Sequence, residues 1–372
     1  MKYVVLVFFA ALCTVSSVGG QVMPIDKKAT KETVNLYKNL KKLASKGTMF
    51  GQQDALAYGL NADGSRWMGE KGRCDVKTVT GDYPAVIGFD LGRLEFDSTR
   101  NLDGVPFEDI RQAIKDTYKR GGVSTISWHF NNPVNPSKST WDKEDSTIKK
   151  LFLSKDALLR YTSWLDKVAA FSKSLKGSKG ELIPVIFRPF HEHTGSWFWW
   201  GAGHCSPEEY VKMWRFTVDY LKNKKGVHNF IYAYSTDLFT SEEHYLERYP
   251  GDKYVDLLGF DYYHRNAPTS NDDFLKNAHR MIATIGKLAK EKKKLSGITE
   301  MGLEQVTEAN WWTNIVLPLI YKQGLSYVLV WRNGRPDHYY APYKGQKSEQ
   351  DFIQFYQLPQ TLFSKEAQGL YK

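Results

Sequence analysis

Beyond its first twenty residues, the sequence lacks any long hydrophobic run. The apolar segment at residues 3–15 follows Lys2, precedes the small residues "SSVGG", and is shorter than the roughly 20 residues that a membrane span needs. This arrangement is typical of a secretory signal peptide. We therefore expect a signal peptide at residues 1–20 and a mature chain at 21–372 that is secreted and does not bind membranes.

Cysteine is also scarce. Of three cysteines, Cys13 belongs to the N-terminal segment, which leaves Cys74 and Cys205 in the mature chain. Each lies in a glycine-rich stretch typical of a loop, "EKGRC" and "WGAGHC". Export permits a disulfide between them, and the sequence leaves open whether they pair or stay free.

Nucleic-acid-binding motifs are missing, although the formal net charge is +10. The lysines are scattered along apparent helix faces, as in "KNLKKLASK", which indicates a solvated surface rather than a basic groove. Low-complexity linkers and obvious internal repeats are missing as well. We expect no nucleic-acid partner and a monomer.

What the sequence does have is an alternation of short apolar segments with longer helical patterns. Most of the intervening helical patterns have Pro, Ser or Thr near their start and Gly at their end. The segments after the first and fifth apolar runs are less regular, and we assign no helix to them from the sequence. The predicted strands cover residues 47–53, 83–92, 122–130, 182–190, 228–236, 254–263, 295–302 and 325–333.

Eight apolar strands that alternate with helices predict an α/β fold, a single-domain (β/α)8 TIM barrel. The alternative is an open, doubly wound sheet, which often carries a glycine-rich turn after its first strand. The sequence "FGQQDALAYG" at that position is not such a turn.

Two glutamates stand at predicted strand ends, where a barrel places its active site. Glu192 follows the fourth strand in "RPFHEHTG", and Glu300 closes the seventh in "SGITE". A glycosidase needs two carboxyl groups flanking one bond. Apolar and aromatic neighbours favour a protonated acid at Glu192, whereas Glu300 suits an ionised nucleophile supported by Arg188, Tyr263 or Arg332.

Aromatic side chains crowd the same strand ends, as expected for a site that stacks on sugar rings. Trp214, Trp311 and Trp312 lie on predicted helices, and we expect them in the core. His191, His193 and His204 lack the spacing of a metal site, so we expect no catalytic metal and no cofactor. The candidate sugar platforms, each with core packing as the alternative, are Trp128, Trp141, Trp197, Trp199, Trp200 and Trp331.

The segments "FRPFHEHTGSWFWWG", "GITEMG", "ISWHFNNP", "GFDYY" and "VWRN" resemble glycoside hydrolase family 26, whose commonest members are β-mannanases. The resemblance covers most of the mature chain. It implies a TIM barrel, a secreted endo-β-1,4-mannanase, a retaining mechanism, Glu192 as acid/base and Glu300 as nucleophile.

The resemblance also implies the substrate-binding residues. His191 would hold one of the glutamates in place. Tyr262 competes with Tyr263 for its position, and Trp141 is a less certain match. The residues expected to line the site of the attacked sugar are His129, Tyr263, Trp331 and Arg332.

Three alternatives remain open. The same scaffold can act on another β-glycan, such as mixed-linkage β-glucan or β-1,3-xylan. A catalytically inactive carbohydrate-binding protein is disfavoured because both Glu192 and Glu300 are present. A polyanion binder is suggested by the basic charge alone.

Overall fold

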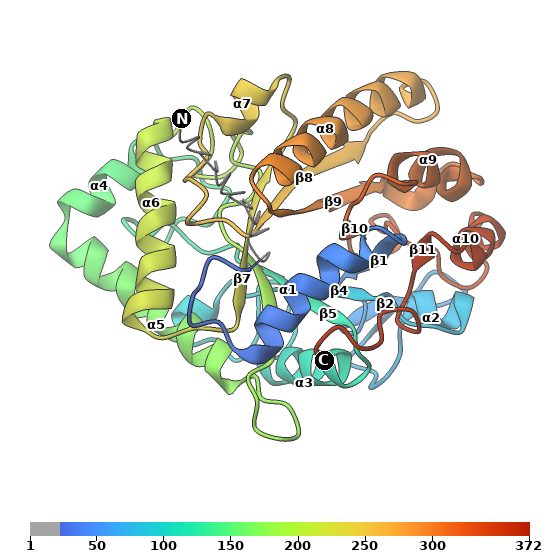
Figure 1. The fold of residues 1–372 in the computed structure, drawn as a ribbon, viewed down its shortest axis with the longest axis horizontal. Coiled ribbons are helices and arrows are strands. Elements are labelled where there is room, and N and C mark those ends of the chain that lie inside the picture. Colours follow the sequence, from blue (N-terminus) through green and yellow to red (C-terminus); the bar gives the residue numbers. More distant parts are fainter. Residues whose placement is uncertain (1–22) are drawn as a thin grey trace, which may run out of the picture.

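The computed structural model describes residues 23–372. Eight parallel strands form a closed barrel, because β1 pairs with both β10 and β4 (Figure 1). All eight predicted strands are confirmed, and so is the TIM-barrel fold. The barrel strands are β1 (Thr48–Gln53), β4 (Val86–Asp90), β5 (Val123–Ser127), β6 (Val185–Arg188), β7 (Phe230–Thr236), β8 (Leu257–His264), β9 (Leu295–Leu303) and β10 (Tyr327–Val330).

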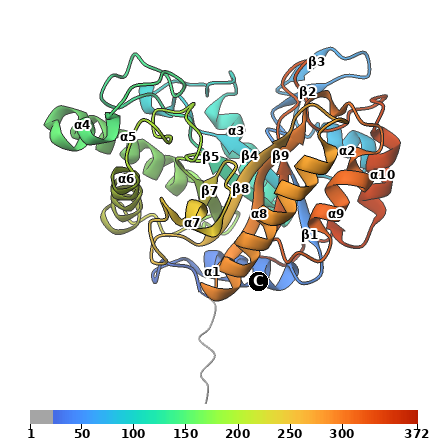
Figure 2. The ribbon, with the colours of Figure 1, turned by 90° about the horizontal axis from the view of Figure 1, so that it is seen from above.

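Helices surround the barrel (Figure 2). The Thr30 side chain caps the first helix. Ser206 and Glu209 form a capping box at the start of the helix that begins at Pro207. The irregular segments after β1 and β7 hold only short helices, together with an antiparallel hairpin of β2 (Tyr58–Leu60) and β3 (Arg66–Met68). The α-helices are α1 (Lys31–Leu43), α2 (Asp75–Thr80), α3 (Phe107–Lys119), α4 (Thr147–Leu153), α5 (Lys155–Ser174), α6 (Pro207–Asp219), α7 (Glu242–Leu246), α8 (Asn271–Glu291), α9 (Leu317–Ile320) and α10 (Glu349–Gln357).

The helical pattern predicted over residues 308–324 forms a shorter element. A π-type turn at Trp312–Val316 leads into the four-residue α9. Pro318 lies inside this stretch and has no backbone N–H to donate, which removes one regular helical bond. A short β11 (Thr361–Leu362) adds to β1 at the end of the chain.

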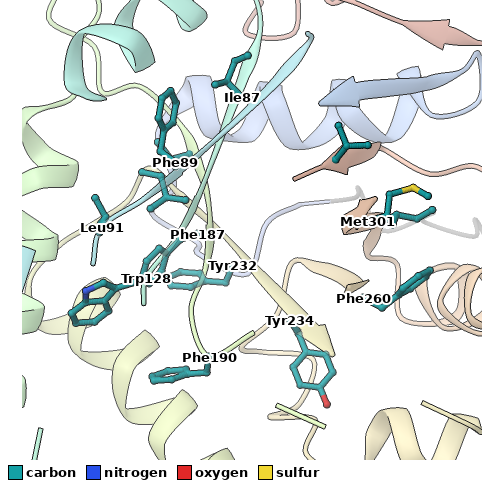
Figure 3. Close-up of a cluster of buried hydrophobic side chains, with 14 of the residues drawn as sticks. Ile87, Phe89, Leu91, Trp128, Phe187, Phe190, Tyr232, Tyr234, Phe260 and Met301 are labelled. Carbon is teal, nitrogen blue, oxygen red and sulfur yellow. The ribbon is translucent and has the colours of Figure 1, made fainter. Parts of the chain in front are cut away.

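Two hydrophobic cores hold these layers together. The inner core contains at least one residue from every barrel strand, and Leu36, Tyr37 and Leu40 of α1 close its lower end. The outer core packs the opposite faces of the strands against the helices, and Figure 3 shows Phe89, Phe187 and other members of it. Trp214, Trp311 and Trp312 are fully buried in the outer core, which confirms their expected structural role.

The inward face of each strand changes from apolar to polar along its length. Side chains two residues apart share a face of a strand, so Arg188 points into the barrel above Ile186. Positions two or four residues apart place polar side chains above the inner core on other strands as well: Ser235 above Ala233, Asp90 above Val86 and Asp261 above Leu257. The barrel therefore presents buried polar groups at the carboxyl ends of its strands.

The predicted signal peptide lies outside the described residues. Within residues 23–372, no helix combines the length and the apolar character needed to cross a bilayer.

Candidate active site

Three carboxylates meet at the carboxyl ends of β6, β8 and β9. Glu192, Asp261 and Glu300 each place an oxygen within 4.8 Å of the others. Glu300 is only 3% exposed, and Asp261 is fully buried. The structure thus brings together the two glutamates that the sequence singled out, 108 positions apart in numbering, and adds an aspartate that the sequence reasoning missed.

A β-bulge aims Glu300 into this cluster. Phe260 pairs with Ile298, but the next residue, Asp261, pairs with Glu300, so Thr299 is an extra residue on β9. Bulges re-aim side chains in this way beside many active sites. The Thr299 hydroxyl donates to an oxygen of Asp261 at 2.7 Å, so the extra residue also helps to fix the aspartate.

Arg188 links two of the three carboxylates. Its guanidinium donates to Asp261 at 2.7 Å and also bonds to Glu300. Burial disfavours the charge on Arg188, but the two carboxylates outweigh burial and raise its pKa. The Tyr263 hydroxyl donates to the other oxygen of Glu300 at 2.8 Å. Glu300 therefore has a cation on one oxygen and a hydroxyl donor on the other, and such charge-assisted hydrogen bonds are among the strong ones.

The same arrangement bears on metal binding. A cage of three carboxylates is a common ligand set for a hard cation. Here Arg188 already supplies the positive charge to Asp261 and Glu300, and a second cation at the same oxygens would be repelled by it. The chemistry of the donor set favours acid–base work over metal ligation.

Glu192 has a different environment from Glu300. It lies in the loop after β6 with a φ of 55°, a left-handed conformation that non-glycine residues adopt rarely and that clusters at functional sites. Its backbone N–H donates to the carbonyl of Ser235 at 3.0 Å. Burial and the charges of Asp261, Glu300 and Asp237 raise the pKa of Glu192 well above its usual range.

Trp197 contacts Glu192 directly. Its indole N–H donates to an oxygen of Glu192 at 2.6 Å, and this bond opposes the rise of the carboxyl pKa. Trp197 was expected as a sugar platform. In the structure it orients the glutamate and also lines the pocket beside it.

His129 and His191 form a buried pair behind the carboxylates. Asp90 accepts from Nδ1 of His129 at 2.7 Å, and Nε2 of His129 lies 3.1 Å from Nε2 of His191. Burial opposes a charge on His129, but Asp90 outweighs it and raises its pKa, whereas burial, Arg188 and His129 lower the pKa of His191. Asp90 therefore favours the protonated form of His129, whereas the surroundings of His191 favour its neutral form.

His191 was expected to hold one of the glutamates. The one hydrogen bond of its side chain among the described residues runs to His129, and its Nδ1 has no partner there. The expectation for His129 also changes, because both of its ring nitrogens are engaged by protein groups. Its ring face stacks on Trp141, with centroids 5.3 Å apart.

The indoles divide into two groups. Trp128, Trp199 and Trp200 are fully buried, so the core alternative holds for them and they are not platforms. The loops that carry these three tryptophans fold back into the core, and the indole N–H of Trp200 donates to the backbone carbonyl of His191. In contrast, Trp141 is 50% exposed, and Trp197 and Trp331 are partly exposed.

Arg332 does not support Glu300. Its guanidinium bonds to Asp103 and donates to the Tyr58 hydroxyl at 3.3 Å. Tyr58 in turn donates to Asp54 at 2.7 Å. The two contacts of Arg332 each span more than 200 positions in sequence, so nothing local to "VWRN" predicts them.

The adjacent tyrosines both reach the site. Tyr263 bonds to Glu300, and Tyr262 lines a pocket of about 530 Å³ that also includes Trp141, Glu192 and Trp197.

Cys74 and Cys205 are both free and buried, which excludes the disulfide between them.

The missed aspartates share a sequence pattern. Asp90 ends the run "IGFD" and Asp261 ends "LGFD". Each is a charged residue that follows an apolar run within its strand, and each pairs with a group of the site, His129 or Arg188. The repeated "GFD" is the signal that identifies both.

Known proteins share this fold and sequence. The sequence profile of glycosyl hydrolase family 26 matches residues 25–311. A family 26 β-mannanase structure from Bacteroides ovatus is 45% identical, with a TM-score of 0.87 over 92% of this chain and 98% of that one.

Two curated relatives carry the name mannan endo-1,4-beta-mannosidase. The one from Bifidobacterium adolescentis is 32% identical over 371 residues, which cover 93% of this chain and 36% of that protein. The one from Bacillus subtilis is 28% identical over 250 residues, 65% of this chain and 66% of that protein. The chain therefore spans about a third and about two thirds of the lengths of these relatives. Together with the barrel and the paired glutamates, these matches show that the chain is a glycoside hydrolase and belongs to glycosyl hydrolase family 26.

Proposed function

We propose that the protein is a secreted endo-β-1,4-mannanase that hydrolyses mannan, glucomannan or galactomannan with retention of configuration. The observation that carries the mechanism is the pair of glutamates in unlike environments. Arg188 and Tyr263 bond to Glu300, whereas Glu192 has a raised pKa and places an oxygen within 4.8 Å of an oxygen of Glu300. The names of the relatives support mannan as the substrate.

In the first step, Glu300 attacks the anomeric carbon as an ionised carboxylate. The bond between that carbon and the departing oxygen breaks, and Glu192 gives its proton to the oxygen. The raised pKa of Glu192 keeps this proton available. Arg188 and Tyr263 bond to the two oxygens of Glu300 and fix their positions.

In the second step, Glu192 acts as a base. It takes a proton from water, the water oxygen attacks the anomeric carbon, and Glu300 leaves as a carboxylate. Retaining glycosidases hold their carboxyl groups about 5–5.5 Å apart, and inverting ones about 6.5–9.5 Å to admit the water. The short separation of Glu192 and Glu300 supports retention.

The remaining groups position the sugar. Trp141 and Trp331 offer partly exposed indole faces for pyranose rings. His129 and His191 are buried and hydrogen-bonded to each other beside the site. Arg332 is held by Asp103.

Hydrolysis of a polysaccharide panel tests the substrate. Purified mature protein, residues 21–372, would be incubated with ivory-nut mannan, barley β-glucan, β-1,3-xylan and xylan, and the products separated by size. Short manno-oligosaccharides from mannan alone are expected. Cleavage of another glycan would overturn the substrate but keep the chemistry, and cleavage of none would overturn the proposed function. Mass analysis of the protein from the culture medium of its host tests the secretion and the cut near Gly20.

A further inference from the structure

Arg248 is a buried cation that the reaction described above does not use. It lies in the segment between α7 and β8, and its side chain is almost fully buried. Its one ion pair among the described residues is a long one, 3.7 Å to the exposed carboxylate of Glu247. Burying a guanidinium costs free energy unless the group is paired and hydrogen-bonded. The remaining contacts of Arg248 therefore indicate what it is buried for.

Both arms of the guanidinium contact Cys205. Nη2 of Arg248 donates to the backbone carbonyl of Cys205 at 3.0 Å, and Nη1 donates to its Sγ at 3.4 Å. The thiol in turn donates to the carbonyl of Trp200 at 3.2 Å. Cys205 stands near the end of the loop between β6 and α6, directly before the helix cap Ser206. Arg248 thus fixes the far end of the loop that carries Glu192.

Backbone hydrogen bonds connect this fixed end to Glu192. Ala202 and Cys205 form a β-bridge. The N–H of Ala202 donates to the carbonyls of His193 and Gly195, at 2.9 and 2.8 Å. The N–H of Gly195 donates to the carbonyl of Glu192 at 2.9 Å. The loop therefore forms one hydrogen-bonded unit from the acid/base to the residue that the arginine holds.

The side chain next to Glu192 offers no polar contact of its own. The ring of His193 is fully buried between Tyr210 and Tyr234, with centroids 4.4 and 4.7 Å away. Neither of its ring nitrogens has a hydrogen-bond partner among the described residues. Glu192 itself adopts a left-handed φ of 55°, a conformation that persists only where the surrounding structure enforces it. The backbone bonds that lead to Arg248 supply directional contacts for this enforcement.

We propose that Arg248 is a positioning residue for the acid/base: by holding Cys205, it keeps the Glu192 carboxyl at the glycosidic oxygen that receives its proton. The proposal rests on the proposed function, because it concerns the proton transfer of that reaction. The hydrogen bonds of Arg248 among the described residues run to Cys205 and not to Glu192, so the arginine acts through the loop.

Two substrates separate the proton transfer from the rest of the reaction. Mannotetraose departs with a sugar whose oxygen Glu192 must protonate, whereas β-mannobiosyl fluoride releases fluoride, which needs no proton. For both substrates, kcat/KM covers the steps up to the glycosyl-enzyme. The ratio of kcat/KM for mannotetraose to that for the fluoride therefore falls when Glu192 is misplaced, and a role in stability alone does not move it.

The ratio would be measured in Arg248→Met, Arg248→Lys and a matched control, Arg215→Met. Arg215 of α6 also donates to a backbone carbonyl of the segment between α7 and β8, that of Pro250, at 2.8 Å. It makes no hydrogen bond to the loop of Glu192 among the described residues. Thermal unfolding of each variant records the effect on stability separately.

We expect Arg248→Met to lower the ratio roughly tenfold or more, because a small misplacement of a catalytic group costs up to about 10²-fold in rate. Arg248→Lys keeps one donor, and its ratio should lie between those of the wild type and Arg248→Met. Arg215→Met should keep the wild-type ratio.

A wild-type ratio in folded Arg248→Met, or an equal fall in Arg215→Met, would overturn the positioning role and leave the proposed function intact. If Arg248→Met does not fold, Arg248→Lys decides: a fall of about threefold or more supports the role, and a wild-type ratio overturns it. Wild-type protein that cleaves neither substrate would overturn the proposed function itself.

Discussion

Replacing Arg188 isolates the electrostatics of the site. Arg188→Met removes the buried guanidinium that bonds to Asp261 and Glu300 and leaves two carboxylates with oxygens at most 4.8 Å apart. With an effective dielectric constant of about 20, two charges at that distance repel by about 3.5 kcal/mol. This free energy corresponds to roughly a 300-fold fall in the population with both groups ionised.

The loss has a defined direction in pH. Ionisation of both carboxylates grows as the pH rises, so Arg188→Met should move the acid limb of the kcat/KM profile to higher pH and lower kcat by about 10²-fold or more near neutrality. Arg188→Lys keeps the positive charge but loses the two-armed geometry of the guanidinium. Its kcat and its acid limb should therefore lie between those of the wild type and those of Arg188→Met. The assay is initial-rate hydrolysis of β-mannobiosyl fluoride across the pH range.

A double variant separates electrostatics from damage to the fold. Breaking a buried ion pair costs about 3–5 kcal/mol of stability, so thermal unfolding is measured beside the rates. Adding Asp261→Asn to Arg188→Met removes one of the two repelling charges, and this variant should recover at least tenfold of the lost rate. An Arg188→Met protein that is folded, with a wild-type acid limb and kcat, would refute the reasoning.

Further predictions concern groups around this cluster. The Trp197 N–H bonds to the carboxylate of Glu192 and opposes the rise of its pKa, so Trp197→Phe should raise that pKa, keep the acid protonated longer and move the alkaline limb of kcat up by about one unit; an alkaline limb that moves down would contradict the assignment. Asp90→Asn removes the carboxylate that raises the pKa of His129, so NMR titration should show His129 losing its charge at lower pH, with kcat/KM down about tenfold; an unshifted titration would show that Asp90 is not the cause. Because Cys74 and Cys205 are free and buried, a reductant should leave the thermal midpoint unchanged, and a thiol reagent should react with both only after unfolding.

Much of the fold could be predicted because each barrel strand carries its own local signal. Runs such as "LIPVIFRPF" and "YVDLLGFDYY" are buried on both sides, and their apolar character marks them as parallel strands. The positions of Glu192 and Glu300 at strand ends follow from the same runs. The inward alternation from Leu257 to Asp261 was present in the sequence as well, but it becomes readable only once the inner face of the strand is known.

The rest depends on contacts that no local pattern encodes. The bulge at Thr299 aims Glu300, and it exists only in the pairing of β9 with β8. Trp128, Trp199 and Trp200 look like sugar platforms in sequence, yet their loops fold back into the core. Arg332 lies near the carboxyl end of its strand, as Arg188 does, but its partner Asp103 comes from a distant loop.

Trapping the glycosyl-enzyme tests the central claim most directly, because three carboxylates lie close enough to be the nucleophile. A 2-deoxy-2-fluoro-β-mannosyl fluoride slows both steps and lets the covalent intermediate accumulate, and peptide mass mapping then locates the sugar. We expect one label per chain, on Glu300. A label on Glu192 or Asp261, or a mannan-cleaving protein that takes no label and releases products of inverted configuration, would contradict it.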